Sequence, residues 1–311
     1  MAKTAQDVRV DTPAFGIELE MIGDADTAVS EMMRLGFVDP DFADGYSRNT
    51  CGYDNCGCGE DDCSCCNGTC DCYSDRCGRL HAYHCDCSLC DYDRDFGLFA
   101  AQEDCTVSAE FVSRILRVTS PSDMEELAEF DAQFSHIADA SNWHRVGRDA
   151  GNHIHVGASD RRAIGRWTGL HMGTFREQWL KVGAGGGDEV RYYNGRPDET
   201  NVWGASQALR EYHNGSSWVS PRNATVEYRI WNSPRESGWI PFHVNMSLAM
   251  TRWASLMHDR HGDITVGEAQ KVVRAGRPRR AFSEVALFLD DRVPGSQTHE
   301  AKLMDLVQNS L

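Results

Sequence analysis

Four short segments alternate apolar residues with charged residues or histidines, and this pattern most limits what the chain can fold into. They are FGIELEM (residues 15–21), EDCTVSAEFV (103–112), GNHIHVG (151–157) and ATVEYRIW (224–231). Because successive side chains of a strand point to opposite faces, each segment predicts a β-strand with one apolar and one polar face. In one sheet with helices over the apolar face, the polar face would gather Glu18, Glu20, Asp104, Glu110, His153, His155, Glu227 and Arg229.

The composition of this expected face indicates a metal site. For any one strand a solvated outer face is the alternative, but solvated strands usually carry Lys, Thr, Ser and Gln, and this face has no Lys. Glu18 and Glu20 would lie roughly 6 to 7 Å apart, so their charges repel unless a cation relieves them. Carboxylate oxygens suit Mg²⁺ or Mn²⁺. A guanidinium such as that of Arg229 can reach a phosphoryl group bound by the same ions.

Of the 13 cysteines, all but Cys105 lie between residues 51 and 90, where aliphatic residues are nearly absent. Such a segment cannot form a hydrophobic core, so disulfides or bound metal must order it. The N-terminus shows no signal peptide, which favours a cytoplasmic protein and thiolate-bound Zn²⁺; disulfides or an iron–sulfur or redox role are the alternatives. With His81 and His84, the cysteines suffice for about three zinc ions. The predicted zinc ligands are Cys51, Cys56, Cys58, Cys63, Cys65, Cys66, Cys70, Cys72, Cys77, Cys85, Cys87 and Cys90.

Length and charge set the remaining limits. At 311 residues and 41% hydrophobic composition, the chain can bury the core of one large domain. We expect a discontinuous catalytic domain, residues 1–50 and 91–311, interrupted by the zinc-binding insert at 51–90. The net charge of −16 argues against a broad nucleic-acid-binding surface. No apolar stretch predicts a membrane span.

Helices are expected to cover the sheet. Residues 120–140 show apolar residues at helical spacing, with Ser122 as the expected N-cap and Glu125 as its capping-box partner. Residues 161–183 and 237–259 also predict amphipathic helices, and the last fifty residues suggest short ones.

The ordered set of motifs, E-x-E, an acidic strand, H-x-H and E-x-R, resembles that of the amidoligases, relatives of glutamine synthetase and glutamate–cysteine ligase in the carboxylate–amine ligase superfamily. The motifs span residues 15 to about 233, apart from the cysteine-rich insert. The resemblance implies an α+β fold with a cupped antiparallel sheet of glutamine-synthetase type and helices on one face. It also implies ATP- and Mg²⁺- (or Mn²⁺-) dependent formation of an amide, peptide or isopeptide bond through an acyl phosphate.

The resemblance also implies roles by motif position. His155 would lie near the phosphates, Arg229 would stabilise the transferring phosphoryl group, and Glu110 would join them in the catalytic centre. Arg191 and Asn194, in a segment that weakly resembles the family's tyrosine–asparagine element, would bind nucleotide or substrate. The implied magnesium ligands are Glu18, Glu20, Asp104, Glu110, His153 and Glu227.

Other interpretations of the same residues remain open. Either histidine could be structural, and Arg229 could pair with Glu227 or Asp104. Asp104 is followed by Cys105 where relatives often have an Asp-Gly-Ser turn. A metal-dependent hydrolase could use the same Glu and His ligands, and a zinc-stabilised binding protein could keep the sheet as a scaffold. The expected substrates are small-molecule, peptide or protein carboxylates and amines.

Overall fold

The computed structural model describes residues 14–39, 97–102, 107–143, 150–184, 218–221, 225–234, 236–262 and 264–310. The cysteine-rich insert and the predicted site residues Asp104, Arg191 and Asn194 lie outside these ranges. The predicted domain boundaries at 50 and 91 lie outside them as well.

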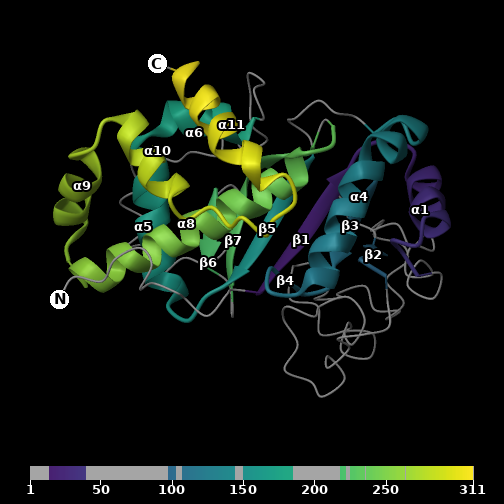
Figure 1. Cartoon of the computed structure of the whole chain (residues 1–311), viewed down its shortest axis with the longest axis horizontal. Helices are drawn as coiled ribbons and strands as arrows, with labels where there is room; N and C mark the ends of the chain where they lie inside the picture. The colour runs from purple at the N-terminus through teal and green to yellow at the C-terminus, as the bar shows by residue number, and fades with distance from the viewer. Residues whose placement is uncertain are drawn as a thin grey trace, which may run out of the picture.

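An antiparallel sheet forms the centre of the described fold, so the predicted combination of helices with an antiparallel sheet is confirmed (Figure 1). Its strands follow the order β2-β3-β1-β5-β7-β6, and β4 pairs with the first residues of β1. The two central strands, β1 and β5, come from the E-x-E and H-x-H segments. The strands are β1 (Ala14–Met21), β2 (Phe99–Gln102), β3 (Ala109–Ser113), β4 (Leu116–Arg117), β5 (Gly151–Gly157), β6 (Val219–Pro221) and β7 (Thr225–Asn232).

The register of the sheet brings polar residues of neighbouring strands face to face. Glu18 of β1 lies directly opposite His153 of β5, and His155 lies opposite Glu227 of β7. On the other side of β1, Glu20 is paired with Glu110 of β3. Since residues directly opposite in antiparallel strands share a face, these pairs collect on one side of the sheet.

The ladder between β5 and β7 contains a bulge at the centre of this face. Asn152 pairs with Trp231 and Ile154 pairs with Tyr228, so the single residue His153 faces both Arg229 and Ile230. A bulge of this kind reverses the alternation of one strand and re-aims its side chains. It lets Trp231 pack under the helices while Arg229 stays on the polar face.

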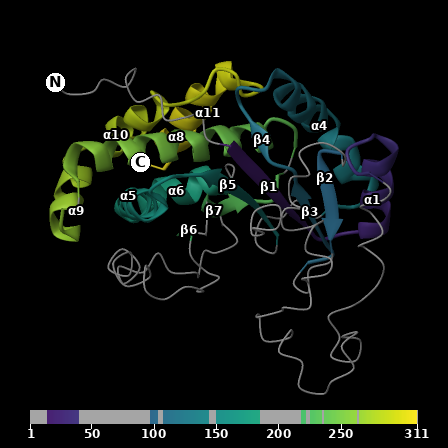
Figure 2. The ribbon, with the colours of Figure 1, turned by 90° about the horizontal axis from the view of Figure 1, so that it is seen from below.

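The helices include two long ones that run along the apolar face of the sheet, as Figure 2 shows for α4 and α8. On α8, Thr251 meets the hydroxyl of Tyr228 at 2.7 Å, and Ser247 accepts from the Trp231 indole at 3.0 Å. On α4, Phe130 packs against Phe99 of β2. The helices are α1 (Ala25–Arg34), α4 (Pro121–Ala140), α5 (Arg161–Thr174), α6 (Arg176–Gly183), α8 (Trp239–His261), α9 (Val266–Arg274), α10 (Pro278–Ala286) and α11 (Ser296–Gln308).

Helix α4 begins earlier than predicted. Its N-cap is Ser120, whose hydroxyl accepts a hydrogen bond from the Asp123 backbone N–H, so the expected cap at Ser122 and its partner Glu125 were wrong. Pro121 stands in the first turn, where its fixed φ suits the helix and its missing N–H costs no hydrogen bond.

Two other predicted elements differ in extent. The helix expected over residues 161–183 is divided into α5 and α6 at Phe175, whose ψ of 46° leaves the helical region while its ring packs on His171. The strand expected over 103–112 begins only at Ala109 in the described part. Ser108, just before it, is instead hydrogen-bonded to the end of β1, since its N–H donates to the Met21 carbonyl and its hydroxyl accepts from the Gly23 N–H.

Among the helices that the structure describes, none is both long enough and apolar enough to cross a bilayer.

Candidate metal centre on the polar sheet face

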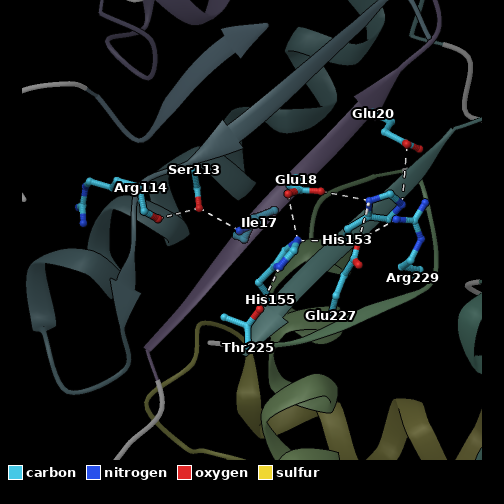
Figure 3. A network of polar contacts seen from close by, with 10 residues as sticks. All are labelled: Ile17, Glu18, Glu20, Ser113, Arg114, His153, His155, Thr225, Glu227 and Arg229. Carbon is cyan, nitrogen blue, oxygen red and sulfur yellow. Dashed lines mark hydrogen bonds and ion pairs between the residues drawn. The ribbon is translucent and has the colours of Figure 1, made fainter. Parts of the chain in front are cut away.

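The structure brings seven of the eight predicted polar-face residues together; the eighth, Asp104, lies outside the described ranges. Figure 3 shows most of these side chains converging on the centre of the sheet, with Glu18 between the two histidines. The seven are Glu18 and Glu20 from β1, Glu110 from β3, His153 and His155 from β5, and Glu227 and Arg229 from β7.

Glu18 is the centre of this cluster. Its Oε1 lies 2.9 Å from His155 Nε2, and its Oε2 lies 3.2 Å from His153 Nδ1. The side chain is 18% exposed, whereas those of the two imidazoles are buried. One carboxylate therefore contacts both imidazoles and still faces the outside of the sheet.

Glu227 closes the other side of the cluster and is 1% exposed. Its Oε1 accepts a hydrogen bond from Arg229 Nη1 at 2.8 Å and lies 3.7 Å from His153 Nδ1 and 3.9 Å from His155 Nε2. The ion pair considered as an alternative role for Arg229 is thus present. A pair at this position also holds the guanidinium on the polar face.

Both central carboxylates have a lowered pKa despite their burial. Burial raises the pKa of Glu18, but the charges and hydrogen bonds of His155 and His153 outweigh it and bring that pKa well below the usual range. Burial also raises the pKa of Glu227, while His155, Arg229 and His153 lower it to a value below the ordinary one. Both groups are therefore ionised near neutral pH, which is the state that binds a cation.

Two sets of side chains in this cluster fit a divalent cation. Glu18, Glu110 and His153 form one set, and Glu18, His155 and Glu227 form the other; within each set the ligand atoms lie within 4.8 Å of one another. The sets share Glu18, so its carboxylate could bridge two ions. Carboxylate oxygens suit Mg²⁺ and Mn²⁺, and the imidazole in each set is a ligand that Mn²⁺ or Zn²⁺ also accepts.

Glu20 stands apart from the two sets. It is 3% exposed, and its Oε2 accepts a hydrogen bond from the Gly151 backbone N–H at 2.6 Å. Its Oε1 lies 3.8 Å from His153 Nε2. The structure thus places Glu20 beside the predicted site, against the outer edge of the His153 ring.

Three neighbours of the cluster were not predicted. Thr225 Oγ1 lies 3.3 Å from His155 Nδ1, and Ser113 Oγ accepts from the Ile17 N–H at 2.9 Å next to Glu18. Gly151 sits at the polar-face position before His153. A glycine inside a strand pattern indicates a close approach of other groups, which is the signal that could have singled it out.

No protein-family model and no curated protein matches this chain.

Proposed function

We propose that the protein is an ATP-dependent carboxylate–amine ligase of the amidoligase type, with divalent cations on the polar face of a glutamine-synthetase-like sheet. The observation that carries the proposal is the pair of ligand sets that share Glu18, with the Arg229 guanidinium beside them. Two neighbouring cations and an arginine are the usual equipment for phosphoryl transfer.

The charge of the face supports a polyphosphate ligand. The four carboxylates and the guanidinium of the described residues sum to a charge of −3, before the imidazoles are counted. Two divalent cations would change this to +1, which suits the anionic phosphates of ATP. The lowered pKa of Glu18 and Glu227 keeps both carboxylates available for those cations.

The proposed reaction has two steps. An oxygen of the substrate carboxylate attacks the γ-phosphorus of ATP, and the bond to ADP breaks. The amine then attacks the acyl carbon, inorganic phosphate leaves, and the amine nitrogen loses a proton. Cations held by Glu18, Glu110, His153, His155 and Glu227 would neutralise the phosphates, and Arg229 would stabilise the transferring group through its planar fork of donors.

Nucleotide binding gives the first test. Calorimetry with ATP and Mg²⁺ is expected to show binding that Glu18→Ala or Glu227→Ala weakens by about 100-fold or more, because each removes a ligand of a shared site. Glu284→Ala is the matched control, since this carboxylate is exposed and pairs with Arg280 on α10. Equal binding by the site variants and wild type, with all proteins folded, would exclude the cation site.

Arginine chemistry gives the second test. Arg229→Lys is expected to spare Mg·ATP binding and to slow phosphoryl transfer by about 10- to 100-fold, because lysine loses the planar fork. Equal rates would remove Arg229 from the mechanism.

The main rival is a metal-dependent hydrolase, which the histidine in each ligand set favours. Candidate amino acids, polyamines and peptides can be screened for ADP release, with mass spectrometry of the products. The ligase is expected to form ADP in proportion to a product lighter by one water than its two inputs. Turnover without ATP would favour the hydrolase, and no turnover at all would favour a binding protein.

We also propose that residues 51–90 are a structural zinc module. Their soft thiolates are poorly matched to the hard cations expected on the sheet face, so two chemically distinct metal populations are expected in one chain. Elemental analysis should find about two to four Zn²⁺ per chain, with reduced cysteines after denaturation. Stoichiometric disulfides without zinc would contradict this proposal.

A further inference from the structure

One oxygen of Glu227 faces both the guanidinium and the imidazoles of the cluster (Figure 3). Oε1 accepts a hydrogen bond from Arg229 Nη1 at 2.8 Å. The same oxygen lies 3.7 Å from His153 Nδ1 and 3.9 Å from His155 Nε2. The carboxylate is 1% exposed, so water has little access to it and its partners are other side chains.

A cation in the second ligand set would need this carboxylate. Glu227 forms that set with Glu18 and His155, and the ligand atoms lie within 4.8 Å of one another. A divalent cation lies about 2 Å from a carboxylate oxygen that binds it. Since Arg229 Nη1 is 2.8 Å from Oε1, a cation on this oxygen would come within about 5 Å of the guanidinium. Two positive groups this close repel each other strongly where burial limits the screening by solvent.

The Arg229 side chain can give way without a change in the strand. Arg229 and Glu227 are two residues apart on β7, and both lie on the polar face. The Arg229 side chain is 15% exposed, whereas that of Glu227 is 1% exposed, so the guanidinium reaches the outside of the sheet and the carboxylate does not. A change of side-chain rotamer is enough to separate them.

We infer that Arg229 and a divalent cation compete for Glu227, so that a cation bound by Glu18, His155 and Glu227 releases the guanidinium toward the outside of the sheet. The inference rests on the proposed function for its purpose, since the released group would then be available to a phosphoryl group. The competition itself requires no nucleotide. Because coupling between two binding events is reciprocal, an anion that draws Arg229 away would in turn raise the affinity for the cation.

The affinity for Mn²⁺, measured by EPR on the metal-depleted full-length protein, gives the first test. Arg229→Gln removes the competitor, so it is expected to tighten Mn²⁺ binding by about 10-fold. Arg280→Gln is the matched control, because it removes the same charge from an exposed ion pair on α10 and should leave the affinity unchanged. Equal or weaker Mn²⁺ binding by a folded Arg229→Gln protein would overturn the inference.

A second background separates competition from simple charge attraction. Removing any nearby positive charge favours a cation, whether or not the two share a ligand. In Glu227→Gln the shared carboxylate is gone, so a further Arg229→Gln substitution should change Mn²⁺ affinity by only about 2-fold. If the full gain persists in this background, the effect is one of charge alone and the inference fails.

The wild-type protein gives a test that needs no stable site variant. The hydrogen bond to Glu227 should slow rotation of the Arg229 guanidinium about Cζ–Nη1, which ¹⁵N NMR of the arginine side chains measures. Arg229→Lys identifies the signals. Saturating Mg²⁺ is expected to make this rotation faster, and an unchanged rotation would show that the cation and the guanidinium bind Glu227 together, which overturns the inference.

Failure of the inference and failure of the proposed function give different results. If neither wild type nor Arg229→Gln binds Mn²⁺, the cation site and the competition fail together. If wild type binds Mn²⁺ and Arg229→Gln binds it no better, only the competition fails. If the competition is observed and ATP does not bind, the competition stands and the ligase function fails.

Discussion

Buried charges occur on both sides of the sheet, but their partners differ. In the helical layer, Asp290 is 5% exposed and accepts hydrogen bonds from Arg252 at 2.6 Å and from Arg292 at 2.7 and 2.8 Å. Its backbone N–H donates to Asn245, whose amide in turn contacts the Asp290 carbonyl and His299. One carboxylate thus has two guanidiniums, and the neighbouring polar atoms are satisfied by each other.

On the polar face of the sheet, by contrast, the carboxylates outnumber the guanidiniums. Within the described ranges, four carboxylates share two imidazoles and the guanidinium of Arg229. The Asp290 cluster needs nothing further to be stable, whereas the sheet face concentrates negative charge that a cation would compensate. Local arrangements that do not serve stability are expected at functional sites. The contrast separates a cluster that holds the fold together from one whose negative charge suits the proposed cations.

Breaking the Asp290 cluster should give the largest loss of stability. Asp290→Asn leaves the guanidinium of Arg252, 11% exposed, without its carboxylate, so we expect the free energy of unfolding to fall by about 3 kcal/mol. The proposed cation site predicts that Mn²⁺ raises the melting temperature, and this rise should be the same in the variant as in wild type, since the sheet face is intact. Denaturant unfolding and thermal shifts with and without Mn²⁺ measure both quantities. A lost Mn²⁺ response would show that the two clusters are coupled.

The Asp290 carboxylate should also make the stability of the protein fall at low pH. Burial raises the pKa of Asp290, but Arg292 and Arg252 bring it down to about 2. Because the folded pKa is below that of the unfolded chain, its contribution is fully present above about pH 4 and is lost as the pH falls toward 2. Asp290→Asn should therefore show a weaker dependence of stability on pH over this window.

An effect of intermediate size is expected from two consecutive residues of β5, which point to opposite faces of the sheet and so compare the two faces directly. Asn152 is fully buried under α8, where its amide lies 2.9 Å from Nδ1 of His243, whose ring is stacked on Trp231. Burial brings the pKa of His243 to about 3, so the ring is neutral and Nδ1 can accept from the amide. Asn152→Ala is expected to cost about 1 to 3 kcal/mol of stability and to leave Mn²⁺ affinity unchanged.

The neighbouring substitution should have the reverse outcome. His153→Ala removes a ligand from one set, so Mn²⁺ affinity should fall by about 100-fold while stability changes by less than in Asn152→Ala. If both substitutions lower stability and affinity to the same extent, the two faces of β5 do not have separate roles.

The alternating segments predicted the central strands closely. The GNHIHVG pattern matches β5 at both ends, and FGIELEM misses only Ala14 at the start of β1. Such strands are set by which side chains are buried, and the sequence records that directly. The short strands β2, β4 and β6 have four, two and three residues, which are too few for an alternation to show. Pairing fixes them instead: β2 and β6 pair with the next strand along the chain, and β4 pairs with the distant β1.

The site was predicted in composition but not in detail. Alternation placed Glu18, His153 and Glu227 on one face, since periodicity fixes the face of each residue once the strand is known. It could not show that Glu20 is drawn to the Gly151 N–H, or that a bulge opposite His153 keeps Arg229 on the polar face. Both features depend on register between strands, which local sequence does not specify.

The smallest expected effect is a pH dependence of opposite sign in the helical layer. Both oxygens of Asp131 on α4 accept from the Gly238 N–H at the start of α8, at 2.9 and 2.7 Å. Burial raises the pKa of Asp131 to about 6, although the Gly238 hydrogen bond and Lys302 act in the other direction. Because the folded pKa exceeds that of the unfolded chain, the contribution of Asp131 to stability is present below about pH 4 and is lost as the pH rises through 6.

Asp131→Asn keeps an acceptor for Gly238 and removes the titration. The free energy of unfolding of the variant should therefore gain about 1 kcal/mol over that of wild type between pH 4 and pH 7, after allowance for solvent screening. Urea unfolding at pH 4, 5, 6 and 7 measures this difference, and a constant difference between the two proteins across the series would contradict it.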